Sequence, residues 1–322
     1  METARVATQS RAEPIPPASI LDVSPRRLRF REWSGPRDRR TFVCLHGLGG
    51  SHLNWIAVAD QLSEAGRVLA IDLPGFGCSS PASGITCLDE MCDGVRDTID
   101  ALAVGRVTLV GQGMGAMVAL LQARGCARVD SVIATAPPLA PAEEWARAAH
   151  VLVGPAGMLA ERAAQTLVHS ASIGGELTGW LTEQFIQDGS ADPTAIPDWV
   201  SSANIEDGNQ LLLGPAVAGI GSASASLVSK ARTPGWIAHV VSQVTCPVLV
   251  IHGTEDRHAP AKWSTRACAD HDGWTLRLLE GVGHNAHMEA ADRWMDAVEE
   301  WFARPLEVDS GGRARADTAG RF

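Results

Sequence analysis

The stretch Val107–Leu120, VTLVGQGMGAMVAL, constrains the fold of this chain more than any other segment. It predicts a buried strand, Val107–Val110, followed by a glycine-flanked turn and a helix rich in Ala, Leu and Val. This is the layout of a G-x-S-x-G turn, in which a sharp strand-to-helix connection lifts one side chain into an active site. Gly111 and Gly115 hold the outer glycine positions, but the central residue is Gly113. The stretch therefore predicts the turn and lacks its nucleophile.

Composition indicates a globular protein and excludes several functions. The 322 residues are 45% hydrophobic and 20% charged, which is enough apolar material for one large α/β domain. A formal net charge of -10, with no Lys/Arg-rich run, argues against nucleic-acid binding. No apolar run reaches the length of a membrane span. We therefore expect a small-molecule ligand and no nucleic-acid partner, whereas the composition leaves the oligomeric state open.

The seven cysteines are scattered and form no C-x-x-C pair. This pattern predicts neither a disulfide framework nor a zinc site, and no other motif indicates a metal or a cofactor. The first twenty residues lack the apolar segment of a signal peptide. A reduced, cytoplasmic protein is the expectation.

Strands and helices are predicted to alternate in the first part of the chain. An edge strand is expected at Arg27–Trp33, and the further strands are expected at Thr41–His46, Val68–Asp72, Val107–Val110 and Val129–Ala136. Helices are expected at about Leu53–Ala65 and Leu88–Ala103. The alternation resumes with a strand at Pro247–His252 and ends in a helix at Ala286–Phe302. This order is typical of a doubly wound, mostly parallel sheet with helices on both faces.

Residues 139–240 interrupt the alternation and divide the predicted core. They contain the amphipathic stretches Ala142–Met158 and Gly175–Gln187, together with Gly/Ser-rich stretches such as GIGSASAS that predict loops. We interpret 139–240 as a helical lid between core segments 25–138 and 241–306, the alternative being a small separate domain. Residues 1–24 are predicted to be a flexible arm and 307–322 a disordered tail.

Five loops that follow predicted strands carry motifs in a fixed order: HGLGG at 46–50, DLPGFG at 72–77, GQGMG at 111–115, GTEDRHAP at 253–260 and GVGHNAH at 281–287. Together they resemble the α/β-hydrolase superfamily over roughly residues 27–305. The resemblance implies an α/β-hydrolase fold and an esterase-like site with residues in the order nucleophile, acid, base.

Carried over position by position, the resemblance places Gly113 at the nucleophile, Asp256 at the acid and His284 at the base. It places the oxyanion hole at the backbone amides of Met114 and Leu48. Gly47 and Gly49 flank Leu48 in the same ligand-binding loop. His287 and Glu289 follow the base, and they fit a supporting role or an ordinary surface position equally well.

Gly113 excludes a covalent step at the G-x-S-x-G turn, here called the elbow (residues 111–115). Three hypotheses remain. We favour a carboxylic ester or thioester hydrolase in which Gly113 replaces the elbow serine. The second is a binding protein on a hydrolase fold that holds an acyl or aromatic small molecule. The third is an enzyme in which the Asp256–His284 dyad is a general base without a covalent intermediate, as in lyases or cofactor-free oxygenases. Four tryptophans of the predicted lid are candidates to line an apolar pocket: Trp145, Trp180, Trp199 and Trp236.

Overall fold

The computed structural model describes residues 14–36, 39–102, 105–145, 175–303, 307–308 and 314–315. Eight of the described strands form one sheet in the order β1-β2-β4-β3-β5-β6-β7-β8. These strands are β1 (Ser19–Val23), β2 (Arg26–Trp33), β3 (Arg40–Leu45), β4 (Gly66–Ile71), β5 (Val107–Gln112), β6 (Val129–Thr135), β7 (Val248–Gly253) and β8 (Trp274–Leu279). The β1–β2 and β2–β4 pairs are antiparallel, whereas β3 to β8 pair in parallel. The predicted mostly parallel α/β sheet is confirmed.

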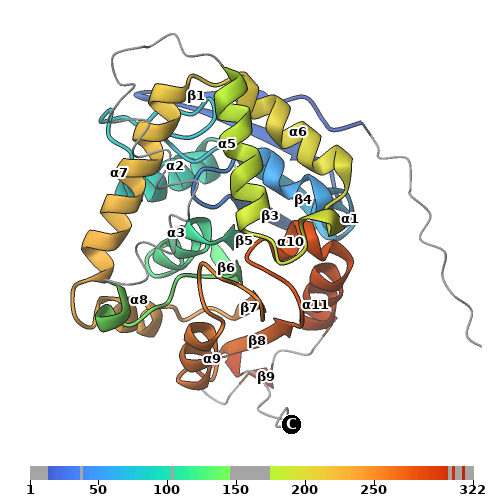
Figure 1. Cartoon of the computed structure of the whole chain (residues 1–322). Coiled ribbons are helices and arrows are strands. Elements are labelled where there is room, and N and C mark those ends of the chain that lie inside the picture. The colour runs from blue at the N-terminus through green and yellow to red at the C-terminus, as the bar shows by residue number, and fades with distance from the viewer. Residues whose placement is uncertain are drawn as a thin grey trace, which may run out of the picture.

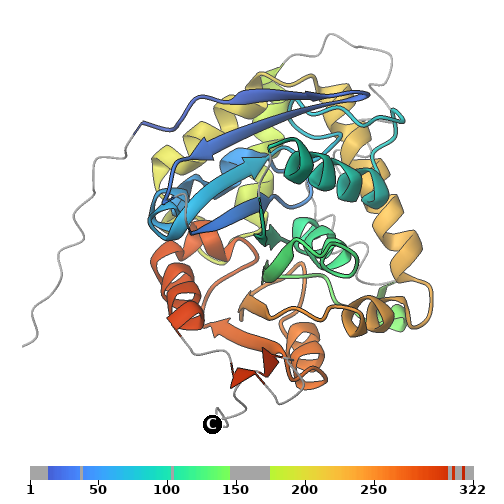
Figure 2. The same cartoon turned by 180° about the vertical axis from the view of Figure 1, so that it is seen from behind.

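Helices cover both faces of this sheet (Figures 1 and 2). One face carries η1 (His52–Trp55), α1 (Ile56–Ala65), α10 (Ala286–Glu289) and α11 (Ala291–Ala303). The other face carries α2 (Leu88–Ala101), α3 (Met114–Ala123) and α9 (Lys262–Ala269). No described helix combines the length and the apolar character that crossing a membrane requires.

The period of two along each strand separates the core into two layers. In β3, Phe42 and Cys44 belong to the apolar cluster beneath α1 and α11, whereas Val43 and Leu45 belong to the cluster beneath α2 and α3. Successive side chains of a strand point to opposite faces, so a strand covered on both faces needs apolar residues at every position. This is why the central strands of this chain are continuous apolar runs.

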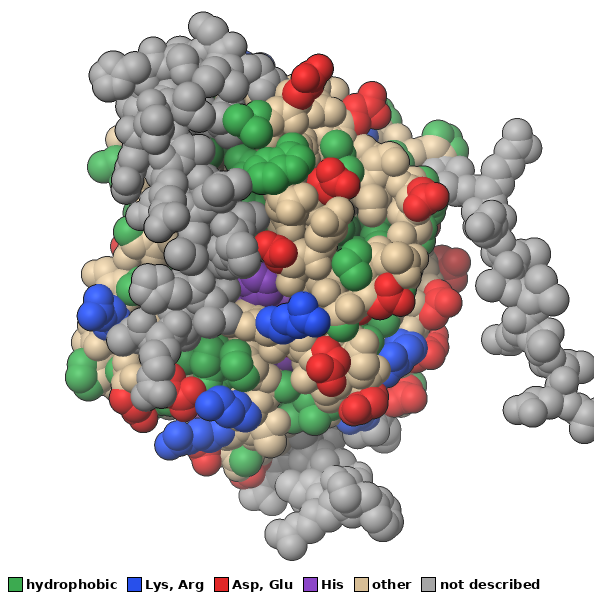
Figure 3. All heavy atoms as spheres, in the orientation of Figure 1, with side chains coloured by type: hydrophobic (Ala, Val, Ile, Leu, Met, Phe, Trp, Pro, Cys, Tyr) green, Lys and Arg blue, Asp and Glu red, His purple; other side chains and the backbone are tan. Residues whose placement is uncertain are grey.

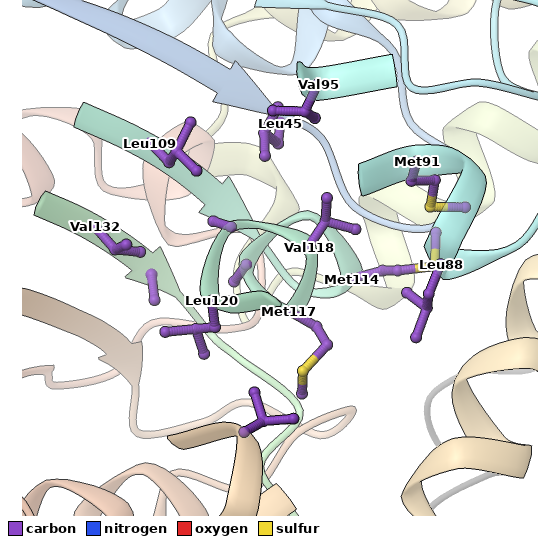
Figure 4. Packing of buried hydrophobic residues seen from close by; sticks show 14 of the residues in the cluster. Leu45, Leu88, Met91, Val95, Leu109, Met114, Met117, Val118, Leu120 and Val132 are labelled. Carbon is purple, nitrogen blue, oxygen red and sulfur yellow. The ribbon is translucent and has the colours of Figure 1, made fainter. Parts of the chain in front are cut away.

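Helix α3 is buried almost all round, which explains why it carries so few polar residues. All but two of its ten residues are buried. Figure 4 shows Met114 beside Leu88 of α2 and Val118 pointing toward Leu45 of β3. A helix that is apolar on every side belongs in the interior of a domain. The N-terminus of α3, where the elbow lies, is therefore held by packing in several directions.

Two glycines let the elbow approach neighbouring backbone closely. A Cβ at Gly115 would overlap the carbonyl oxygens of Leu45 and His46, at the end of β3. A Cβ at Gly111 would overlap the backbone of Gly115 and Ala116 in the first turn of α3. Both outer positions of the turn therefore require glycine for space, and the contact at Gly115 places the 46–50 loop against the elbow.

Between β6 and β7, the described residues 175–242 consist of helices joined by short connections. This segment, here called the α5–α8 segment, contains α5 (Gly175–Asp188), η2 (Pro193–Ala195), α6 (Asp198–Asn209), α7 (Leu213–Ala231) and α8 (Trp236–Ser242). In Figure 1, α5, α6 and α7 lie in front of the sheet, on the viewer's side. The helix predicted at Ala142–Met158 is described only at 142–145, where it is helical, and the rest of it lies outside the described residues.

The prediction of a loop at GIGSASAS was wrong, because these residues, 219–226, lie inside α7. Small residues are needed there for close packing. A Cβ at Gly219 would lie 2.5 Å from the carbonyl oxygen of Gly75 in the core. Composition alone indicated a loop, whereas the tertiary contact requires a helix with a small-residue face.

A buried ion cluster joins the α5–α8 segment to the sheet. The Arg29 guanidinium in β2 donates to Asp72 at 2.6 Å and to both carboxylate oxygens of Asp207 in α6, at 2.9 and 2.7 Å. Asp72 also accepts from the backbone N–H of His52, at 2.8 Å. Bidentate pairing of Arg with carboxylate is among the strongest polar contacts in proteins. The cluster fixes where α6 meets the core.

Two predictions about the N-terminal part of the chain need correction. Residues 19–23, part of the predicted flexible arm 1–24, form β1 and pair with β2, so β2 is not an edge strand. Backbone pairing places these residues in the sheet, which their polar composition did not indicate. Within 307–322 the structure describes two short paired strands, β9 (Glu307–Val308) and β10 (Ala314–Arg315), and disorder of this tail stays a prediction. Residues 1–13 and the rest of the tail lie outside the described residues.

Replacing Gly115 by Ala should destabilise the fold strongly. The new methyl group would overlap the carbonyls of Leu45 and His46. Overpacking of this kind typically costs about 1–3 kcal/mol, and backbone atoms yield less readily than side chains. We expect a lower urea midpoint with an unchanged slope. The matched control is Gly125→Ala, because nothing lies within 4 Å of a Cβ at Gly125. Equal midpoints for the two variants would contradict the close contact.

Candidate active site

Gly113 sits at the tip of the elbow with backbone angles of φ 54° and ψ -116°. This positive φ is unfavourable for a residue with a Cβ, by about 1–3 kcal/mol, and glycine avoids that strain. A Cβ built on Gly113 would lie 3.0 Å from Nε2 of His284. The imidazole therefore faces the position that the resemblance assigns to the nucleophile, and it lies closer than a side chain there would allow without a small shift of the ring.

His284 is paired on its other side with Asp256. The Nδ1 of His284 lies 2.7 Å from Oδ2 of Asp256. Asp256 follows β7 and His284 follows β8, so two neighbouring parallel strands deliver the pair to one edge of the sheet. Nδ1–H donates a hydrogen bond to the carboxylate, and Nε2 is the ring nitrogen directed toward Gly113. The predicted Asp256 and His284 are thus brought together with Gly113.

The Asp256 carboxylate is buried and fully hydrogen-bonded. Oδ1 accepts from the backbone N–H groups of His258 and Ala259, at 2.8 and 2.9 Å. Oδ2 accepts from His252 Nε2, at 3.0 Å, as well as from His284. Burial raises the pKa of Asp256, but the charge of His284 and the hydrogen bonds from the two histidines outweigh it, so the pKa lies well below its ordinary value. The group stays ionised and can stabilise an imidazolium.

A cavity of about 80 Å³ lies beside the elbow and His284, and we call it the His284 cavity. Its lining includes Gly47, Leu48, Gly113 and Met114, which the sequence predicted. Gly49 instead lines an adjacent cavity of about 360 Å³. None of the four tryptophans proposed from the sequence as pocket residues lines the described part of the His284 cavity. Of these, Trp145 is buried with Nε1–H donating to the Ala140 carbonyl, and Trp180 and Trp199 are exposed.

His46 holds the 46–50 loop in place. The Leu73 N–H donates to Nε2 of His46 at 3.0 Å, so Nδ1 carries the proton and donates to the Gly47 carbonyl at 2.7 Å. Complete burial lowers the pKa of His46 to about 4, despite the opposing charge of Asp72. A neutral imidazole therefore links the 46–50 loop to the loop after β4.

Glu289 joins the loop of His284 to the α5–α8 segment. Its buried carboxylate accepts from the backbone N–H groups of Gly283 at 2.9 Å, Ala191 at 3.1 Å and Asp192 at 2.8 Å. Glu289 is therefore not an ordinary surface residue, because it is buried and binds the loop of His284. His287 is also buried, and its ring lies 4.5 Å from that of Trp55. The sequence signal for Glu289 was its place shortly after His284.

Sequence reasoning did not single out several other lining residues. Gln112, His258 and Asn285 lie inside the quoted motifs, but at positions to which the resemblance assigns no role. Asn54 of η1 and the residues of α5 and α7 belong to no motif; the latter are Phe185, Ile186, Ser224, Leu227 and Val228. His258 and His284 have ring centroids 5.4 Å apart. Within the described part of the chain, no cluster of His, Cys, Asp or Glu has the arrangement of a metal site.

Comparison with known proteins gives the same family as the sequence motifs. The alpha/beta hydrolase family model matches residues 42–299. The chain is 26% identical to an uncharacterized protein of Mycobacterium tuberculosis, across 90% of this chain and 86% of that one. It is 22% identical to the (E)-2-((N-methylformamido)methylene)succinate hydrolase of Acinetobacter baylyi, across 80% of this chain and 89% of that one.

Among solved structures, the enol-lactonase from Burkholderia xenovorans has the same fold, with a TM-score of 0.67 and 20% identity across 89% of this chain and 100% of that one. The family model covers most of the chain, from the middle of β3 to α11. The chain belongs to the alpha/beta hydrolase family.

Two buried histidines should make the fold acid-sensitive. Burial lowers the pKa of His46 to about 4 and that of His287 to about 3, from about 6.5 in the unfolded chain. Below pH 6.5 the unfolded chain therefore binds protons that the folded chain does not, and stability falls as the pH decreases toward 4. We expect each histidine to account for roughly 2–3 kcal/mol of lost stability between pH 7 and pH 4.5 in urea unfolding.

The variant His287→Phe keeps an aromatic ring against Trp55. It should remove the part of the pH dependence of the unfolding free energy that comes from protonation of one histidine. His239→Gln, at an exposed position of α8, is the matched control and should keep the full dependence. A pH dependence that is the same in His287→Phe as in the unaltered chain would show that His287 does not supply it.

Proposed function

We propose that this chain is an α/β-hydrolase of the carboxylic ester or thioester type in which Gly113 replaces the elbow nucleophile. It binds a small acyl compound at the elbow. The observation that carries this proposal is the alignment of three groups. Asp256 lies 2.7 Å from Nδ1 of His284, and Nε2 of His284 lies 3.0 Å from the Cβ position of residue 113. A serine hydroxyl at 113 would be within hydrogen-bond reach of that nitrogen.

The remaining machinery does not depend on a side chain at position 113. In a serine hydrolase, the histidine takes the hydroxyl proton, the carboxylate stabilises the imidazolium, and backbone N–H groups bind the developing oxyanion. Leu48 and Met114 line the His284 cavity, and we assign the oxyanion hole to their N–H groups. Because glycine also has a backbone N–H and allows the same turn, its presence removes only the hydroxyl. Binding of a carbonyl group is retained.

We also propose that residues 139–240 are the lid of this site. Support comes from the cavity lining, to which α5 contributes Phe185 and Ile186 and α7 contributes Leu227 and Val228. These apolar side chains face the glycine loop and the elbow across a small space. A lid of this kind excludes water from the carbonyl and selects the acyl group by size.

A second candidate uses water in place of the serine hydroxyl. The observation that favours it is the exposure of His284 Nε2 toward the cavity at Gly113, where no side chain intervenes. A water molecule there would be activated by the dyad as a general base. Removal of a triad member typically leaves only about 10³–10⁴-fold acceleration over the uncatalysed reaction, so this route predicts slow turnover that His284→Ala abolishes.

Gly113→Ser should restore ester hydrolysis. The serine hydroxyl would reach His284 once the ring moves by a few tenths of an ångström. We expect kcat/KM for p-nitrophenyl acetate and butyrate to rise by about 10²-fold or more over the unaltered chain, since nucleophile and base act as a unit. Urea unfolding should show a loss of about 1–3 kcal/mol, because serine must adopt a positive φ.

Two further variants make this test specific. Gly113→Ala carries the same backbone strain without a hydroxyl and should stay at the level of the unaltered chain. Gly113→Ser combined with His284→Ala should lose the gain. An inactive Gly113→Ser variant that still binds esters would support the binding protein instead, and strong activity in the unaltered chain would place the nucleophile elsewhere.

A further inference from the structure

One face of α7 is apolar except for a single hydroxyl. Ile220, Ala223 and Leu227 are buried on this face and belong to the core cluster around α3. Ser224 lies between them at helical spacing and lines the His284 cavity together with Leu227 and Val228. A serine in the middle of an apolar helix face, at the wall of an active-site cavity, requires a physical explanation.

The hydroxyl of Ser224 is buried and has no hydrogen-bond partner within the described part of the chain. Side-chain polar atoms in this condition are few here, and Ser224 Oγ is the one that lines the His284 cavity. A helical serine usually bonds to the carbonyl four residues earlier or to water. A buried polar atom without a partner destabilises a protein, so it marks a place where a partner binds.

Three contacts hold α7 so that this hydroxyl stays at the cavity. Gly219 packs against the carbonyl of Gly75. Ser226 Oγ accepts from the N–H of Leu88 at 3.2 Å, and Lys230 pairs with Asp89 at 3.1 Å. These contacts lie on both sides of Ser224 along the helix. The position of the hydroxyl is therefore set by the core and α2, independently of any ligand.

Apart from His284, the other polar side chains of the described lining already have partners; His258, for example, has Nε2 at 3.0 Å from the Asp188 carbonyl. Asn54 accepts from the Ser51 N–H at 2.7 Å, and Gln112 and Asn285 donate to the carbonyls of His284 and Ile186, at 3.5 and 3.3 Å. No Lys, Arg, Asp or Glu is among the described residues that line this cavity. A charged ligand group would have no countercharge there, whereas a neutral hydrogen-bonding group would match Ser224.

We propose that Ser224 is a ligand-positioning residue of the His284 cavity, and that the bound acyl compound carries a neutral oxygen substituent, a ketone or hydroxyl, that hydrogen-bonds to it. This deepens the proposed function and rests on it for the ester or thioester group at the elbow. The apolar neighbours Leu227 and Val228 bind the carbon chain, and the hydroxyl of Ser224 selects the chain with an oxygen at the right carbon.

The test compares three esters of similar shape: methyl pentanoate, methyl 3-oxopentanoate and methyl 4-oxopentanoate. Dissociation constants for the unaltered chain come from ligand-observed NMR titration, which needs no turnover. We expect one oxo ester to bind about threefold to tenfold more tightly than methyl pentanoate, the gain typical of one neutral hydrogen bond. Ser224→Ala should remove this preference and still bind methyl pentanoate, which shows that the cavity is intact.

Ser229→Ala is the matched control, because Ser229 lies on the same helix at an exposed position. It should keep the preference. The proposal is overturned if Ser224→Ala retains the preference, if the unaltered chain shows none, or if no ester binds.

Hydrolysis by Gly113→Ser is measured separately, so that the two proposals can be told apart. A preference lost in Ser224→Ala while Gly113→Ser is inactive would uphold the role of Ser224 and reject the hydrolase proposal. If Gly113→Ser is active and the unaltered chain shows no preference for an oxo ester, the hydrolase proposal is upheld and the role of Ser224 is rejected.

Discussion

The close approach of Gly115 to the end of β3 is the contact on which the rest of the site depends. Because no Cβ intervenes, the first turn of α3 rests directly on the carbonyls of Leu45 and His46. This contact sets the distance between the glycine loop at 46–50 and the elbow, and therefore the width of the space where a carbonyl would bind. Burial of α3 on every side then prevents the helix from relaxing away.

Buried carboxylates hold the α5–α8 segment against the sheet and against the loop of His284. Asp72 and Asp207 bind Arg29 between the sheet and α6. Glu289 binds backbone N–H groups in the His284 loop and in residues 191–192. Each is well supplied with donors, which is the condition under which a buried charge can be retained. The α5–α8 segment is thus placed by the same groups that place the base, so movements of the two are expected to be linked.

Motifs at the ends of buried strands were predictable from the sequence, and contacts between helices were not. The elbow, Asp256 and His284 follow apolar runs whose period and order indicate a parallel sheet, so the structure brings them together as predicted. GIGSASAS was assigned to a loop because small residues are ambiguous: they suit loops, and they also suit a helix face that packs on backbone, as Gly219 does on Gly75. Ser224 was missed for the same reason.

The hydrogen bonds around the Asp256–His284 pair do not depend on residue 113. Four hydrogen bonds hold Asp256 ionised, and none of them involves residue 113. The orientation of His284 depends on Asp256, and the loop of His284 depends on Glu289. A glycine at position 113 therefore leaves these polar groups with all their partners and avoids backbone strain at a positive φ. The same independence underlies the proposal that an added hydroxyl at residue 113 would give ester hydrolysis, because Asp256 and His284 are already paired.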